Sequence, residues 1–196
     1  MPTPISRKRG SFRRLLFLCT DNYLASRYCE ELFNSRIRGE GLNWQGISRS
    51  FAGLPEPRPN EPMAPEAVLG LRQRGAAPVN HRRLPLAALP FDFETSQIGV
   101  ALLRRPERSV LLKAWPDQAE RLEIWTIADH DVPALFDELT RAVDALIDRL
   151  ISDAAETLSP AADRGERGIS AKLDRLFPTG PGSGDGRFDS LKTANP

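Results

Sequence analysis

The sequence predicts an α/β domain with three layers, in which a central, mainly parallel four-stranded sheet has helices on both faces. Apolar runs typical of strands alternate with amphipathic helical stretches, and this alternation favours a parallel sheet. The first run, residues 15–18, is continuously apolar, as expected for a strand buried on both faces. Ligands of such sheets bind beyond the carboxyl ends of the strands, and Cys19 lies at the end of this first run.

The following elements are predicted from periodicity and from turn residues. One helical face is formed after the first strand by Ala25, Cys29, Leu32 and Phe33. Further strands are expected at 44–52, 96–103 and 122–128, and a short extended run at 109–114. Prolines indicate loops and short turns over 55–62 and 76–95.

Two more helices are predicted from their first turns. Pro65 suits the start of a helix that runs to about Arg74 and stops at Gly75. Pro133 suits the start of the last helix, whose apolar stripe is Leu135, Leu139, Val143, Leu146, Ile147 and Leu150.

Length and composition indicate one globular domain with flanking segments. The chain has 196 residues, of which 40% are hydrophobic and 27% charged. We expect a basic, flexible N-terminus at 1–13, the domain at 14–151 and a largely disordered tail at 152–196. Within the tail, residues 169–177 have the spacing of a short helix, and both a fraying helix and one docked on the domain or on a protein partner remain open.

Charge, cysteine content and histidine spacing predict which partners, location and cofactors the protein has. A net charge of +1 gives no reason to expect nucleic acid or a membrane surface as partner, and no apolar stretch approaches the length of a membrane span. Two cysteines cannot build a disulfide framework, so a cytoplasmic location is expected. We expect no cofactor and no metal, since His81 and His130 lack the spacing of ligands.

The segment around Cys19 combines a strand, a cysteine, a tight loop and a helix start. Free backbone N–H groups and the helix dipole make such a loop an anion site. A cysteine there has a depressed pKa, and its thiolate is a nucleophile. A buried structural cysteine is the alternative.

The loop resembles that of the low-molecular-weight protein tyrosine phosphatases and of the arsenate reductases that share their fold. Their loop reads Cys-x-Gly-Asn-x-x-Arg-Ser, and Cys19, Asn22 and Ser26 match it. The resemblance covers roughly residues 14–151, and its weaker matches lie at 27–34, 50–54, 81–83 and 125–129.

This resemblance implies a mechanism and a substrate class. Cys19 would attack a phosphorylated protein or a small phosphomonoester, and Asp129 would be the general acid, with Asp131 as the other position for this role. Ser26 would hydrogen-bond the thiolate and Asn22 would hold the loop. The phosphate-binding loop would be Thr20, Asp21, Asn22, Tyr23, Leu24, Ala25 and Ser26. Cys29 lies on the apolar helix face, so no second thiol is left for an arsenate reductase.

Two departures from the family loop weaken the predicted activity. Ala25 stands where the family has the arginine that grips phosphate, and a stabilising arginine contributes roughly 10³–10⁵ in rate in other phosphoryl-transfer enzymes. Asp21 replaces the glycine, and two like charges about 4 Å apart repel by about 4 kcal/mol at an effective dielectric near 20. Arg27 lies roughly 200° around the helix from Ala25, so we do not expect it to compensate.

The sequence therefore predicts a phosphatase-like protein whose activity is weak or lost. The alternative is a non-catalytic pseudophosphatase that serves as an anion-binding or protein-interaction module, with its tail as a contact for a protein partner. The arginine pairs at 82–83 and 104–105 are interpreted as solvated charge.

Overall fold

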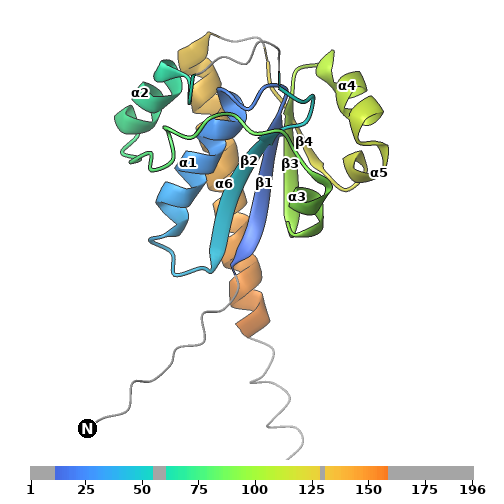
Figure 1. Ribbon diagram of the computed structural model, residues 1–196. Helices are drawn as coiled ribbons and strands as arrows, with labels where there is room; N and C mark the ends of the chain where they lie inside the picture. Colours follow the sequence, from blue (N-terminus) through green and yellow to red (C-terminus); the bar gives the residue numbers. More distant parts are fainter. Residues whose placement is uncertain (1–11, 55–60, 129–130, 159–196) are drawn as a thin grey trace, which may run out of the picture. The chain divides into compact units, whose positions relative to one another are not determined.

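A computed structural model of the chain describes residues 12–54, 61–128 and 131–158. Strands and helices alternate along these residues (Figure 1). In chain order they are β1 (Arg13–Cys19), α1 (Ala25–Ile37), β2 (Trp44–Ser50), α2 (Pro65–Gln73), α3 (Pro90–Glu94), β3 (Ile98–Leu103), α4 (Glu107–Ala114), α5 (Pro116–Ala119), β4 (Glu123–Thr126) and α6 (Val132–Leu158).

The four strands form one sheet in the order β2-β1-β3-β4, and every pair is parallel. The predicted fold class is therefore confirmed. β1 lies inside the sheet, which explains its continuous apolar run. In the register of β1 and β2, Cys19 stands opposite Ser50, so the end of β2 belongs to the surroundings of the thiol.

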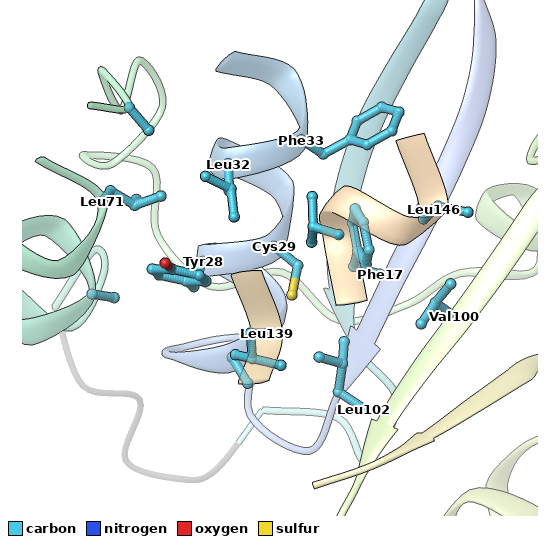
Figure 2. Packing of buried hydrophobic residues seen from close by; sticks show 14 of the residues in the cluster. Phe17, Tyr28, Cys29, Leu32, Phe33, Leu71, Val100, Leu102, Leu139 and Leu146 are labelled. Atoms are coloured by element: carbon cyan, nitrogen blue, oxygen red, sulfur yellow. The ribbon is translucent and has the colours of Figure 1, made fainter. Parts of the chain in front are cut away.

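Helices cover both faces of the sheet (Figure 1). The alternate residues Leu15 and Phe17 of β1 pack with the side of α1, α2 and α6, whereas Leu16 and Leu18 pack with the side of α3, α4 and α5. Figure 2 shows the first of these cores, where the sulfur of Cys29 lies among carbon side chains. Cys29 is fully buried, as its place on the apolar face of the helix predicts.

The extended run predicted at 109–114 is wrong, because these residues belong to α4. The run is short and apolar, and such runs do not distinguish a strand from a helix by periodicity alone. Leu111 is buried, whereas Val110 and Leu112 are both exposed, so only one face of the segment meets the core. The short helices α3 and α5 were also not expected, and each begins with a proline in its first turn, Pro90 and Pro116.

The domain organisation stays a prediction. The chain divides into two compact units, one ending at Asp153 and the other beginning at Ala154. The predicted basic terminus at 1–13 and the predicted helix at 169–177 lie wholly or almost wholly outside the described residues. Within the described ranges, no helix has both the length and the apolar character needed to cross a membrane.

Candidate active site

Cys19 ends β1, and the loop that follows folds back over its sulfur. The Sγ atom lies 2.9 Å from the Ser26 hydroxyl, in the first turn of α1, and accepts a hydrogen bond of 3.2 Å from the backbone N–H of Asn22. Asn22 makes this turn with φ of +55°. Asparagine enters that left-handed region more readily than most residues, so an asparagine at this position suits the conformation.

The Asn22 side chain ties the loop to two neighbouring segments. Its amide nitrogen donates to the hydroxyls of Ser26 (3.0 Å) and Ser48 (2.9 Å). Its amide oxygen accepts from the backbone N–H of Leu86 (2.9 Å). Asn22 is fully buried, and these bonds satisfy the polar groups that burial would otherwise leave without water.

The polar chain continues away from the thiol to a buried ion pair. The Ser48 hydroxyl donates to Oε2 of Glu30 (2.5 Å), and the Arg83 guanidinium donates to the same oxygen (2.8 Å). Glu30 is 4% exposed, and a buried carboxylate needs such a partner. The interpretation of the arginine pair at 82–83 as solvated charge is therefore wrong for Arg83, which compensates Glu30.

Asp21 points toward the thiol instead of away from it. Its Oδ1 atom lies 3.4 Å from Sγ of Cys19, as the acceptor of the thiol proton, and also accepts from the backbone N–H of Tyr23 (3.1 Å). This carboxylate therefore occupies one N–H group of the loop. A phosphate bound against the loop would meet this negative charge at close range.

The thiol is protonated at neutral pH for two main reasons. Burial, followed by the charge of Asp21, raises the pKa of Cys19 to about 11, although hydrogen bonds from Ser26 and Asn22 act in the opposite direction. Nucleophilic cysteines have the opposite property, a pKa lowered below the ordinary value of about 8.5. In this conformation the sulfur is therefore a weak nucleophile.

A cavity of about 240 Å³ opens over the loop. Its walls come from the loop, the segment after β3 and the start of α6, through Cys19, Thr20, Asp21, Tyr23, Leu24, Ala25, Leu102, Arg104, Glu107, Ile127, Val132 and Leu135. Among the described residues that line it, Arg104 is the one with a positive charge, and Arg104 does not belong to the loop. The Glu107 carboxylate accepts from the Thr20 hydroxyl (2.8 Å) and from the backbone N–H of Arg104 (2.6 Å).

Arg27 does not replace the missing loop arginine. It is fully buried, and its guanidinium donates to the carbonyl oxygens of Asn80 and Arg83, each at 2.7 Å. Its Nε lies 3.7 Å from Glu30. Arg27 thus fixes the 80–83 segment against α1 and is absent from the walls of the cavity.

The structure brings the predicted loop residues together but leaves the general acid open. Cys19 is in contact with Asp21, Asn22 and Ser26, and the other residues of the predicted loop line the cavity. Asp129 and His130 lie outside the described residues. Asp131 accepts from the backbone N–H of Ala134 at the start of α6 (3.0 Å). No group of three or more potential metal ligands occurs in the described part of the chain.

Sequence reasoning assigned no role to the polar residues that support the loop from β2 and α1. Ser48 is in contact with Asn22 and Glu30, and the Ser50 hydroxyl donates to carbonyl oxygens of the Thr20 and Gly53 backbones. One signal was present. Gly46, Ser48 and Ser50 alternate in β2, which places small and polar residues on one face of a buried strand.

The fold and the loop are those expected of a phosphatase-like α/β domain. Comparison with solved structures finds the same fold in low-molecular-weight phosphatases. A low molecular weight protein tyrosine phosphatase from T. tengcongensis is 21% identical, with a TM-score of 0.57 over 70% of this chain and 99% of that chain. The low molecular weight phosphotyrosine phosphatase VcLMWPTP-2 from Vibrio cholerae is 19% identical, with a TM-score of 0.57 over 70% and 96%. The YwlE arginine phosphatase from Geobacillus stearothermophilus is 17% identical, with a TM-score of 0.57 over 74% and 96%.

The chain thus has the fold of the low-molecular-weight protein tyrosine phosphatases, as its loop predicts. No family model matches the sequence, and no curated protein matches it. At these identities the likeness establishes the fold alone.

Proposed function

We propose that this chain is a low-molecular-weight-phosphatase-like protein whose hydrolysis of phosphomonoesters is weak or lost. If the protein is active, the Cys19 thiol gives its proton to solvent, and the thiolate attacks phosphorus and forms a thiophosphate while the ester oxygen leaves. Asp129, or Asp131, gives that oxygen its proton. Water then gives a proton back to this carboxylate and cleaves the S–P bond, which releases inorganic phosphate and the thiolate. Ser26 and Asn22 hold the sulfur and the loop. The substrate is a phosphorylated protein or a small phosphomonoester.

One observation supports the proposed loss of activity: the carboxylate of Asp21 lies 3.4 Å from the buried sulfur of Cys19, and burial together with this charge raises the pKa of the thiol. To react, the thiol must lose its proton beside that negative charge, and the substrate must bring more negative charge into the same place. The family loop meets this demand with an arginine, which this loop lacks at Ala25. The buried guanidinium of Arg27 is directed elsewhere.

A second candidate is a non-catalytic pseudophosphatase that binds an anion or a protein partner. The absence of turnover in this candidate is supported by the Asp21 carboxylate, because it takes the Tyr23 N–H that a phosphate would use. The Asp21 side chain thus takes the place of a bound anion and stabilises the loop through its hydrogen bond with Tyr23. A cavity of about 240 Å³ remains beside it, with room for a ligand group that is not turned over.

Hydrolysis of para-nitrophenyl phosphate by the wild type and by Cys19→Ser tests the proposal. We expect a wild-type kcat far below the roughly 10 s⁻¹ that is typical of enzymes, because the nucleophile is protonated and the loop cation is missing. Any weak turnover should disappear in Cys19→Ser. If the wild type shows weak turnover that depends on Cys19, the rates of Asp129→Asn and Asp131→Asn at the same pH identify the general acid as the residue whose loss lowers the rate more.

Typical enzymatic turnover by the wild type that Cys19→Ser abolishes would contradict the proposal. Circular dichroism of both proteins shows that a loss of turnover is not a loss of fold.

A further inference from the structure

A second cavity lies next to the one over the loop, and half of its lining residues are arginines. It measures about 250 Å³, and its walls are Leu103, Arg104, Arg105, Arg108, Ile124 and Thr126. Leu103 and Thr126 stand opposite each other in the parallel register of β3 and β4. The cavity therefore lies at the carboxyl ends of two adjacent strands, where sheets of this type bind their ligands. We call it the arginine cavity.

The charge of the arginine cavity is strongly one-sided. Three of its six described lining residues are arginines, and none of these six is acidic. The neighbouring carboxylate, Glu107, accepts hydrogen bonds from the Thr20 hydroxyl and the Arg104 backbone and lines the other cavity. Side chains of like charge that lie close together repel each other, and an anion bound among them reduces this repulsion.

Guanidinium groups also fit one kind of anion particularly well. Their planar fork of N–H donors pairs bidentately with phosphate or carboxylate oxygens. Three of them around one hollow suit a ligand with several anionic oxygens better than a single small anion. The Thr126 hydroxyl is a further polar group among the walls.

We propose that the arginine cavity is an anion-binding site for a ligand with two or more linked phosphate groups. Arg104 lines this cavity and also the cavity over Cys19, so the two cavities share one arginine. Arg105 and Arg108 line the arginine cavity but not the cavity over Cys19. The inference goes beyond the proposed function and does not depend on whether Cys19 is active.

Titration calorimetry of the full chain with inorganic tripolyphosphate, at low ionic strength, tests the site. We expect the wild type to bind tripolyphosphate more tightly than orthophosphate, with an affinity that falls as salt is added. Arg105→Ala/Arg108→Ala should weaken tripolyphosphate binding about tenfold, since exposed charge pairs contribute up to about 1 kcal/mol each and about 1.4 kcal/mol is tenfold.

The matched control is Arg72→Ala/Arg82→Ala, which removes the same charge from two exposed residues that line neither cavity. It should bind tripolyphosphate like the wild type. The inference is overturned if the wild type does not bind tripolyphosphate, or if both double variants weaken its binding equally, which would indicate attraction to net charge alone. Neither result changes the para-nitrophenyl phosphate experiment, so the two proposals fail separately.

Discussion

The double variant Asp21→Gly/Ala25→Arg should hydrolyse para-nitrophenyl phosphate at least about 10³-fold faster than the wild type. A stabilising arginine contributes roughly 10³–10⁵ in rate in other phosphoryl-transfer enzymes, and Ala25 lines the cavity from the first turn of α1. Removing Asp21 also frees the Tyr23 N–H and takes away a charge that raises the pKa of the Cys19 thiol. The measurement is kcat/KM for the wild type, the two single variants and the double variant.

Adding Cys19→Ser to the double variant is the control, and it should return the rate to that of the wild type or below. The two single variants separate the contributions, since the arginine supplies the cation and the glycine removes the competing carboxylate. A double variant that folds but gains no rate, and is not thermally stabilised by vanadate, would show that the loop does not bind phosphate at all.

The second large effect concerns stability: Arg27→Ala should destabilise the fold by several kcal/mol, about 1–3 kcal/mol for each of the two carbonyl oxygens that lose their donor. The residue is fully buried, and it donates to the carbonyl oxygens of Asn80 and Arg83. Its loss leaves those oxygens without these donors and removes a cation near Glu30. Urea unfolding followed by circular dichroism measures the change.

Arg38→Ala is the matched control, because Arg38 is an exposed arginine at the end of the same helix. Surface substitutions usually change stability by less than about 0.5 kcal/mol. If Arg27→Ala cost no more than this control, Arg27 would not be a structural residue, and its exclusion from the loop chemistry would need a different reason.

The elements that periodicity controls could be predicted from the sequence. The apolar run of β1 and the stripe of α6 each have one interpretation, because burial on both faces or along one face leaves a regular pattern. Residues 109–114 have no such pattern, since only Leu111 of α4 is needed by the core. The same holds for the site, where residues close in sequence could be predicted and residues joined only by the fold could not. Cys19, Asn22 and Ser26 lie in one short segment and were found together, whereas Ser48, Glu30 and Arg83 meet them only through tertiary packing.

The direction of the Asp21 side chain could not be predicted from the sequence at all. An aspartate after a strand can face solvent or its own loop, and the outcome decides whether the loop attracts or repels phosphate. Its hydrogen bonds with Cys19 and Tyr23 show that the Asp21 side chain faces its own loop. Arg27 is the opposite example, because helical geometry alone was sufficient to place it away from Ala25.

The ionisation of the Cys19 thiol tests the central claim most directly. The difference in ultraviolet thiolate absorbance between Cys29→Ala and Cys19→Ser/Cys29→Ala, followed against pH, isolates this one group. Thiolate absorbance should be missing at neutral pH and should develop only as the pH approaches about 11. A midpoint below about 8.5, the value of an ordinary thiol, would mean that the loop activates its cysteine and would contradict the account.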